Sequence, residues 1–94
     1  MAFVYILYSV DLDKFYIGSC LNLSERLEQH TNKIFKDAYT VLANDWKLYL
    51  SEDGLSYEQA RRIETHIKKM KSKTYIKNLI VHPEIIIRLK ERYQ

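Results

Sequence analysis

The chain has few of the residues that cross-link, bend or anchor a protein. Its 94 residues include one cysteine, one proline and two glycines. A single cysteine, Cys20, excludes a disulfide within the chain and a cysteine-based metal site, and it favours a reducing compartment. The apolar start, Met1–Val10, lacks a basic segment and meets Asp11 and Asp13 too early for a signal peptide or a membrane span. We therefore expect a cytoplasmic protein with short turns and no membrane contact.

The composition indicates one folded domain over residues 1–94. Hydrophobic residues make up 47% of the chain and charged residues 29%, which argues against intrinsic disorder. This length is near the lower limit for a core that is stable without cross-links. The formal net charge of +3 is compatible with a polyanionic partner, but it is too small for a protein that coats nucleic acid.

Three strands are predicted. Phe3–Ser9 is apolar on both faces, as in a buried central strand, and turn residues at Val10–Asp13 separate it from a second strand at Lys14–Ser19. A third strand is predicted at Trp46–Ser51, where apolar and polar residues alternate, and Glu52-Asp53-Gly54 is expected to end it.

The length of the first turn determines which tyrosines share a face of the sheet. A four-residue loop sets Ser9 opposite Lys14 and therefore Tyr5 opposite Gly18. Tyr5 and Tyr16 then lie on the same face, whereas a loop shorter by one residue would place them on opposite faces. We predict the first register, in which Gly18 leaves space across from Tyr5.

The first helix is predicted from about Leu23 into the early thirties. Asn22 is its expected N-cap, with Glu25 three residues on. Arg26 lies at the margin of the apolar stripe, and His30, one turn later, lies inside or beside it. That stripe consists of Leu23, Leu27 and Ile34. Residues 31–45 show no clear pattern and are predicted to form a long irregular loop.

A second helix is predicted from the capping box at Ser56–Gln59 to about Lys71. Glu64 lies beside its apolar stripe, so this helix directs a carboxylate toward the core side. The stripe itself consists of Ala60, Ile63, Ile67 and Met70. Ser72–Val81 is expected to be helical, and a last helix begins at His82-Pro83. The remaining side chains of note, His66 on the outward side of its helix, His82 and the buried Cys20, are assigned structural roles.

Five side chains are of the kinds that phosphodiester hydrolysis uses. A carboxylate such as Glu64 can hold Mg²⁺, and arginine, here Arg26, matches a phosphate with two hydrogen bonds. A tyrosine is a poor base unless a cation lowers its pKa, so Tyr5 needs Arg26 or a metal nearby. Tyr16 is the second tyrosine of the set. His30 could orient a tyrosine hydroxyl or carry a proton.

Each of these residues also has an ordinary structural explanation. Glu64 alone would be an ion-pair partner of Arg61 or Lys68 at helical spacing. His30 alone would be a histidine at the edge of the core, and tyrosines are good strand residues wherever they occur. The functional interpretation therefore depends on the ordered set of all five residues.

Taken together, the ordered motifs resemble the GIY-YIG nuclease superfamily over nearly the whole chain. The second half of its signature is present as Tyr16-Ile17-Gly18, and the first half is reduced to Phe3-Val4-Tyr5. Leu23–His30 is similar to the arginine helix of the family, and Ala60–Lys69 to its metal-carboxylate helix. The chain looks like a small stand-alone member with a single domain, related to the N-terminal domain of UvrC-type excinucleases.

The resemblance implies an α+β fold, a three-stranded antiparallel sheet flanked by helices, with a shallow cleft on one sheet face. It also implies DNA cleavage with one divalent metal ion, Mg²⁺ or Mn²⁺. At the matching positions Tyr5 is the candidate general base, and Tyr16 is its partner near the nucleophile or phosphate. Arg26 is the phosphate clamp, His30 supports a tyrosine, and Glu64 is the sole protein ligand of the metal.

Further DNA contacts are predicted outside this set. A basic run follows the Glu64 helix and is expected to position a duplex through its phosphates. It consists of Lys68, Lys69, Lys71, Lys73 and Lys77. Lysines at a helix end also favour the helix dipole, which is the structural alternative. Some family nucleases use an asparagine near the C-terminal side of the fold, and Asn78 is the match for it.

Three functions are compatible with these features. The first is a metal-dependent endonuclease that acts on nicks, branches or loops in DNA repair or recombination. The second is a nucleic-acid-binding module with the same fold and little or no turnover, working with a repair or recombination protein. The third is a protein-interaction domain. The complete set of five residues favours the first, while the substrate structure and the oligomeric state stay open.

Overall fold

The sheet is built around the first strand of the chain. The computed structural model describes the backbone of residues 1–31 and 45–94, and the side chains of 1–29 and 45–94. In chain order the elements are β1 (Ala2–Ser9), β2 (Lys14–Cys20), α1 (Leu23–Thr31), β3 (Lys47–Leu55), α2 (Tyr57–Met70), α3 (Lys73–Val81) and α4 (Glu84–Arg92). The strand order is β2-β1-β3 with both pairs antiparallel. The predicted α+β class and three-stranded sheet are confirmed.

The predicted hairpin register is also confirmed. Ser9 pairs with Lys14, and Tyr5 pairs with Gly18. A Cβ atom on Gly18 would lie 2.5 Å from the Tyr5 hydroxyl oxygen. The space across from Tyr5 is therefore filled by its own phenol, and only a glycine leaves room for that side chain.

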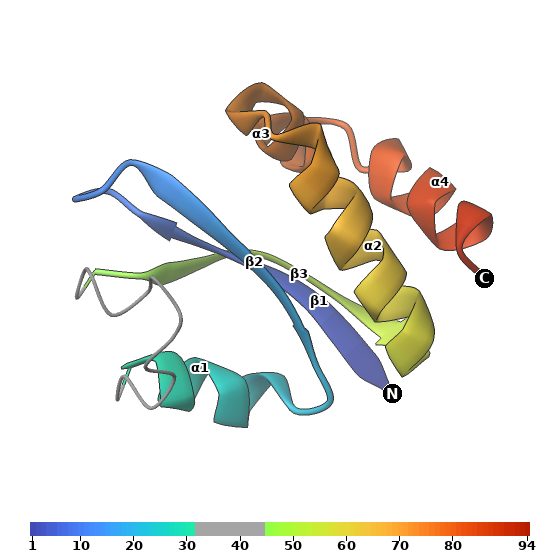
Figure 1. Cartoon of the computed structure of the whole chain (residues 1–94), viewed down its shortest axis with the longest axis horizontal. Helices are drawn as coiled ribbons and strands as arrows, with labels where there is room; N and C mark the ends of the chain where they lie inside the picture. Colours follow the sequence, from blue (N-terminus) through green and yellow to red (C-terminus); the bar gives the residue numbers. More distant parts are fainter. Residues whose placement is uncertain (32–44) are drawn as a thin grey trace.

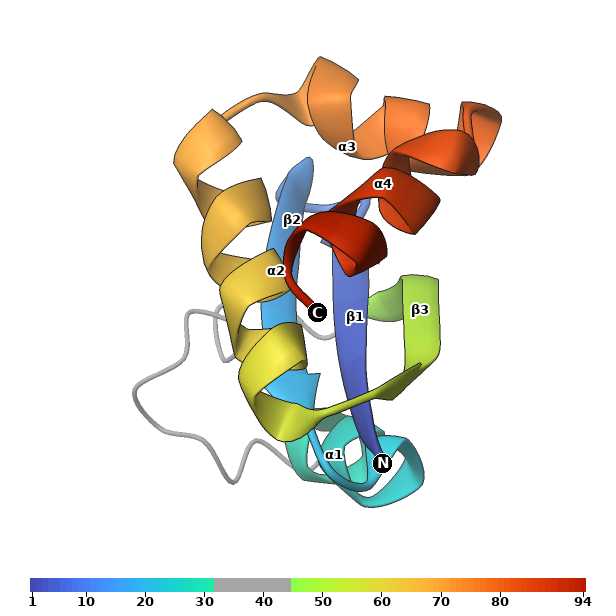
Figure 2. The same ribbon diagram turned by 90° about the vertical axis from the view of Figure 1, so that its right-hand side faces the viewer.

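Helices cover the two faces of the sheet unequally. α1 lies below the sheet, and α2, α3 and α4 lie on the other side (Figures 1 and 2). The main core lies between the sheet and α2–α4, where the buried apolar side chains of all these elements meet. A smaller cluster lies on the α1 face, and it includes Tyr5, Leu7 and Cys20, with Tyr16 and Leu27 packed against them. Two of the candidate catalytic residues therefore belong to the smaller cluster.

The third strand is longer than predicted. It continues through Glu52-Asp53-Gly54 to Leu55, so the prediction that these residues end it is wrong. Ala2 pairs with Leu55 while Val4 pairs with Glu52, which leaves one extra residue on β3. Gly54 has φ +71°, a conformation in which glycine is unstrained, and it absorbs this bulge.

The helix starts agree with the predicted caps. Asn22 Oδ1 accepts a hydrogen bond from the Glu25 amide at 3.0 Å, and Ser56 and Gln59 form the reciprocal capping box. Met70 is 45% exposed, so its assignment to the buried stripe of α2 is wrong. The chain leaves the helix there through Lys71, whose backbone is left-handed, and the stripe ends one turn earlier at Ile67.

α4 returns along α2 and covers a side of it that was expected to face outward. His66 Nδ1 lies 2.8 Å from the Tyr93 hydroxyl, in a partly buried contact. The prediction that His66 points outward is therefore wrong, although its role is structural. Within the part of the chain that the structure describes, no helix combines the length and apolarity needed to cross a bilayer. Ile34 and nearly all of the predicted 31–45 loop lie outside the described residues.

Candidate functional site

Tyr5, Tyr16 and Arg26 come together on the α1 face of the sheet. Strand pairing brings the two tyrosine rings to a centroid distance of 6.3 Å, and the cap at Asn22 begins α1 so that Arg26 follows on its first turn. Tyr5 is 0% exposed, whereas Tyr16 and Arg26 are half-buried. The deeper tyrosine is thus shielded from any ligand that reaches the shallower one.

The buried position of Tyr5 changes the pKa of its phenol. Burial raises the pKa of the Tyr5 phenol well above its usual value, and the neighbouring Tyr16 raises it further. The positive charge of Arg26 and a hydrogen bond with it lower the pKa, but burial is the larger effect. Arg26 therefore contacts Tyr5 without making it a base near neutral pH.

A small polar pocket lies where α1 begins. It has a volume of about 200 Å³ and is lined by Asn22, Glu25, Arg26 and Gln29 from the α1 side, together with Tyr57. Tyr57 is the first residue of α2, two turns before Glu64. The pocket therefore connects the arginine helix to the helix that carries the candidate metal ligand.

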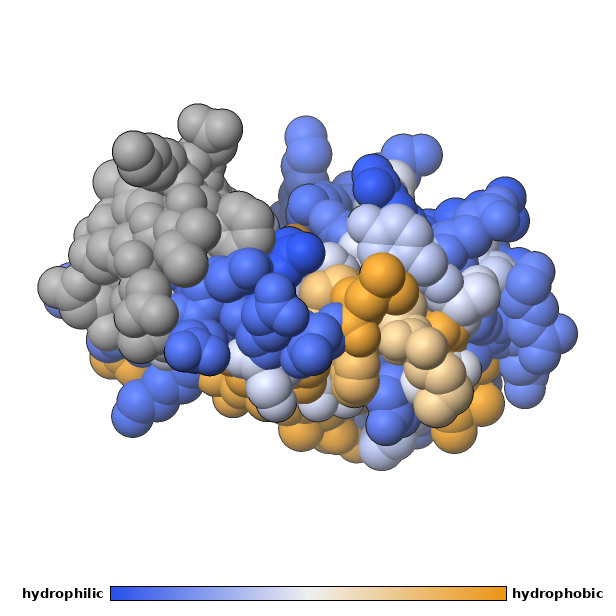
Figure 3. All heavy atoms as spheres, turned by 90° about the horizontal axis from the view of Figure 1, so that it is seen from below, coloured by the Kyte–Doolittle hydropathy of each residue, from blue (hydrophilic) through white to orange (hydrophobic). Residues whose placement is uncertain are grey.

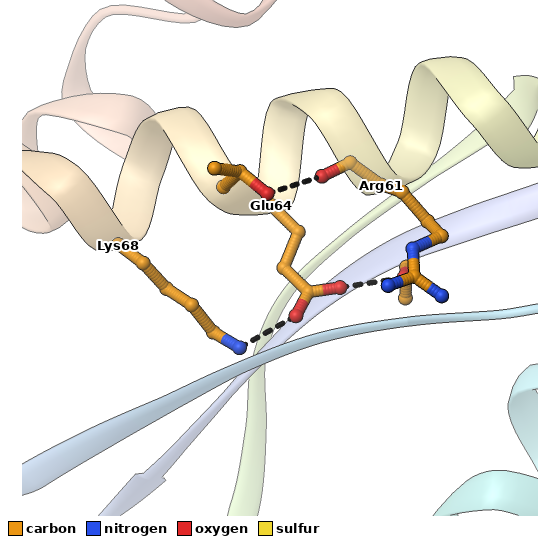
Figure 4. Close-up of polar contacts among 5 residues, drawn as sticks. Arg61, Glu64 and Lys68 are labelled. Atoms are coloured by element: carbon orange, nitrogen blue, oxygen red, sulfur yellow. Dashed lines mark hydrogen bonds and ion pairs between the residues drawn. The ribbon is translucent and has the colours of Figure 1, made fainter.

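Glu64 is held at the edge of the sheet by two partners (Figure 4). The Ser19 hydroxyl donates a hydrogen bond to Oε1 at 2.5 Å, and Lys68 Nζ lies 2.6 Å from Oε2. Of the two expected ion-pair partners Lys68 is the one observed, while the Arg61 guanidinium lies 5.8 Å from the centre of the Tyr57 ring. The Glu64 side chain is 18% exposed, so solvent reaches it.

The site has two parts, the tyrosines with Arg26 and the Glu64 carboxylate, and consecutive residues of β2 contact the two parts. Gly18 packs against the Tyr5 phenol, and Ser19 bonds to Glu64. Because side chains alternate along a strand, these contacts lie on opposite faces of β2, which is an edge strand. The tyrosines and Arg26 lie on one side of this edge, and Glu64 lies on the other.

Two predicted site residues cannot be placed with this group. His30 belongs to the helix α1, but its side chain lies outside the described residues. Asn78 lies within α3, and its carbonyl accepts a hydrogen bond from the His82 amide at 2.7 Å. α3 lies on the side of the sheet opposite α1 (Figure 1), so Asn78 and Arg26 are on different sides.

The predicted basic run does not form one patch. Lys68, Lys71 and Lys73 line a groove between β2 and the α2–α3 corner. Lys69 lines a different groove, of about 710 Å³, beside the contact of α2 with Tyr93, together with Arg61 and His66. Lys77 is exposed on α3. The side of the molecule on which α1 lies is also mixed: seen from below, hydrophobic residues lie near the middle and along the lower edge of the view, with hydrophilic residues between and around them (Figure 3).

The chemistry of the donor set limits how a metal could bind. Among the described residues, no three His, Cys, Asp or Glu side chains gather into a metal-binding cluster. Mg²⁺ keeps several waters and is often held by one or two carboxylates together with substrate phosphates. Glu64 alone fits that mode, provided that the Lys68 ammonium moves aside.

Two residues of the site were not predicted from the sequence. Ser19 holds the Glu64 carboxylate. Strand alternation in the sequence indicates only that Ser19 faces away from Tyr16. Tyr57 forms a wall of the Arg26 pocket, and no local pattern distinguishes it from the other tyrosines. Both roles depend on where α2 packs against β2.

The comparisons with known proteins agree with the motifs. A family model described as the GIY-YIG catalytic domain matches residues 1–78, which include every element up to most of α3. Searches of curated proteins and of solved structures gave no match.

Proposed function

The chain belongs to the GIY-YIG family, whose domains are nuclease domains, and we propose that it is a DNA endonuclease dependent on Mg²⁺ or Mn²⁺. The observation that carries this proposal is the arrangement around β2. Arg26 and Tyr16 lie on one side of this edge strand, and Glu64 is held on the other through Ser19. A phosphodiester lying across the edge would meet all three side chains.

Arg26 is the proposed phosphate-binding group. A guanidinium presents several N–H donors in a planar arrangement that matches phosphate oxygens. Arg26 lines the polar pocket at the start of α1. Tyr5 contacts it from the sheet, so we assign Tyr5 the role of positioning Arg26.

Tyr16 is the proposed partner of the attacking water. Burial and a raised pKa disfavour Tyr5 as the proton acceptor, whereas Tyr16 is half-buried beside it. The phenol oxygen of Tyr16 can accept a hydrogen bond from a water and orient it toward phosphorus. In the attack the water oxygen bonds to phosphorus while the water proton passes to the Tyr16 oxygen and the phenol releases its own proton to solvent. The bond from phosphorus to the leaving oxygen breaks, and that oxygen takes up a proton from solvent.

Glu64 is the proposed metal ligand. A divalent ion bound there would neutralise charge that develops on the phosphate. The hydrogen bond from Ser19 fixes one oxygen of the carboxylate, so the second oxygen is the one available to an ion. Lys68 must leave that oxygen first, and a phosphate oxygen is a suitable new partner for its ammonium.

A binding module without turnover is the second candidate, because both oxygens of Glu64 already have partners. A carboxylate that never exchanges Lys68 for a metal would leave DNA binding intact and abolish cleavage. For the endonuclease we propose substrates with nicks, branches or loops, as in DNA repair or recombination, recognised by shape through phosphate contacts. A repair or recombination protein would then be its partner.

Cleavage of labelled nicked, forked and plain duplex DNA tests the proposal, with Mg²⁺, Mn²⁺ or EDTA. We expect metal-dependent cutting that Tyr16→Phe lowers by about 10²-fold or more, as loss of a proton-transfer group does. Tyr49→Phe is the matched control, since Tyr49 is also a half-buried strand tyrosine but packs with Phe15 and Tyr8 in the other core cluster. Binding without cutting of any substrate would favour the module instead.

A further inference from the structure

A groove lies between the hairpin end of β2 and the corner where α2 meets α3. Figure 2 shows this end of β2 beside α2 and below α3. The groove has a volume of about 860 Å³. Its apolar lining includes Phe15, Ile17, Ile67 and Ile76, all from the edge of the main core. Four lysines line it, and the described residues that form its lining include no aspartate or glutamate.

The four lysines differ in how strongly they are already engaged. Lys68 pairs with Glu64, and Lys73 pairs with Asp13 at 2.8 Å, which ties the hairpin turn to the start of α3. Lys14 and Lys71 form no ion pair with any residue in the described ranges 1–29 and 45–94. These two ammonium groups are therefore available to an anionic ligand.

The corner that carries Lys71 is fixed by backbone contacts. Lys71 has φ 48° and ψ 38°, and its amide donates to the Lys68 carbonyl at 3.3 Å. The next residue, Ser72, caps α3 by accepting a hydrogen bond from the Tyr75 amide at 3.1 Å. One wall of the groove is thus held in place before any ligand binds, which reduces the entropy lost on binding.

We propose that this groove holds unpaired nucleotides of the DNA next to the cleaved bond. The inference rests on the proposed function and adds a substrate class to it. Duplex DNA presents phosphates to a protein but keeps its base faces stacked inside. Unpaired nucleotides expose phosphates, which lysines bind, and also the flat faces of their bases, which can pack on an apolar floor that includes Phe15. Lys68 belongs both to the groove and to the Glu64 ion pair, so a strand in the groove leads to the proposed metal ligand.

Fluorescence anisotropy with a labelled thymidine 15-mer and a blunt duplex of equal length, both in EDTA, tests this site. The test variant is Lys14→Glu/Lys71→Glu. The control, Lys47→Glu/Arg88→Glu, makes the same change in charge at exposed positions on β3 and α4. We expect the test variant to lose about tenfold or more in affinity for the single strand. The salt slope should fall by about 0.7 per lysine, and duplex binding should change no more than in the control.

The outcomes separate the groove from the nuclease function. Equal loss for single strand and duplex would show that the lysines bind phosphates alone, and it would overturn the inference. Unchanged single-strand binding, or a glutamate oligomer that binds the groove more tightly than the thymidine oligomer, would also overturn it. In each of these cases metal-dependent cleavage could persist and the proposed function would stand.

Amide NMR spectra provide a second readout that does not depend on the variant's folding. Titration of the wild-type protein with the thymidine oligomer should shift the resonances of Lys14, Phe15, Ile67, Lys71 and Ile76. Shifts confined to the α1 side would contradict the proposal. Absence of both binding and cleavage for every DNA would instead refute the proposed function itself.

Discussion

At the scale of single residues, the contact between Tyr5 and Gly18 determines the shape of the α1 face. The phenol lies where a side chain of residue 18 would be, and Tyr5 is fully buried. Its ring has no room to move away, because a close-packed interior has few voids larger than a water molecule. Gly18 is thus required for space on an ordinary strand and not for an unusual backbone conformation.

Gly18→Ala should destabilise the protein by about 1–3 kcal/mol, the usual cost of overpacking a core. Urea unfolding measures this free energy. The cost should shrink when Gly18→Ala is made in a Tyr5→Leu background, because the clashing hydroxyl and ring atoms are then gone. Equal costs in the two backgrounds would mean that Tyr5 is not the obstacle.

Lys68 occupies the position that a cation would need at Glu64, and its removal should strengthen metal binding. We expect Lys68→Met to bind Mn²⁺ about 30-fold more tightly, since repulsion between a unit charge and a divalent ion near 4 Å is about 2 kcal/mol in water. The signal of free Mn²⁺ in electron paramagnetic resonance measures the affinity without any substrate. Lys69→Met, the neighbouring lysine in a different groove, should leave it unchanged. Weaker binding by Lys68→Met would show that this lysine assists the ion.

At the scale of elements, α4 contacts α2 through a histidine whose protonated form is disfavoured at that contact. His66 meets Tyr93 at 2.8 Å. Burial lowers the pKa of His66, and the nearby charges of Arg92 and Lys69 lower it further. The folded protein therefore favours the neutral imidazole more than the unfolded chain does.

This difference predicts a loss of stability in mild acid. The contribution of His66 is complete above its unfolded pKa of about 6.5 and is lost as the pH falls through the lower folded value. The free energy of unfolding should therefore decrease from pH 7.5 to 5, and less so in His66→Gln, which cannot titrate. His82→Gln, outside this contact, should retain the wild-type decrease. An identical pH dependence of His66→Gln and the wild type would exclude His66 as the cause.

Local rules predicted the hairpin well and the later elements less well. The four-residue turn and strand alternation were sufficient to pair Tyr5 with Gly18, because both rules act over a few residues. The end of β3 was predicted too early because Glu52-Asp53-Gly54 has the composition of a turn. Only the pairing with β1 reveals the bulge at Gly54. The packing of α4 over His66 could not be predicted, since it depends on a chain reversal that helical periodicity does not encode.

At the scale of the whole molecule, the candidate site is divided between the two layers that flank the sheet. The order of the motifs in the sequence indicated which residues form the site. In the structure these residues lie on the two sides of β2, so that one ligand at this edge can contact them together. The contact of Ser19 with Glu64 could not be derived from the sequence, because it requires α2 to pack along the edge strand. The proposed function therefore depends most on Glu64, whose carboxylate Ser19 holds at this edge.

The most direct measurement is single-turnover DNA cleavage by wild type, Glu64→Gln and Glu58→Gln with Mg²⁺ or Mn²⁺. Both glutamates lie in α2 and each pairs with a cation four residues on, Glu58 with Arg62 and Glu64 with Lys68, but only Glu64 bonds to Ser19. We predict that Glu64→Gln loses about 10²-fold or more of the rate, since the charge stabilisation that a bound metal supplies is worth several kcal/mol, while Glu58→Gln cuts like wild type. Cleavage that survives Glu64→Gln, or falls equally in both variants, would contradict this prediction.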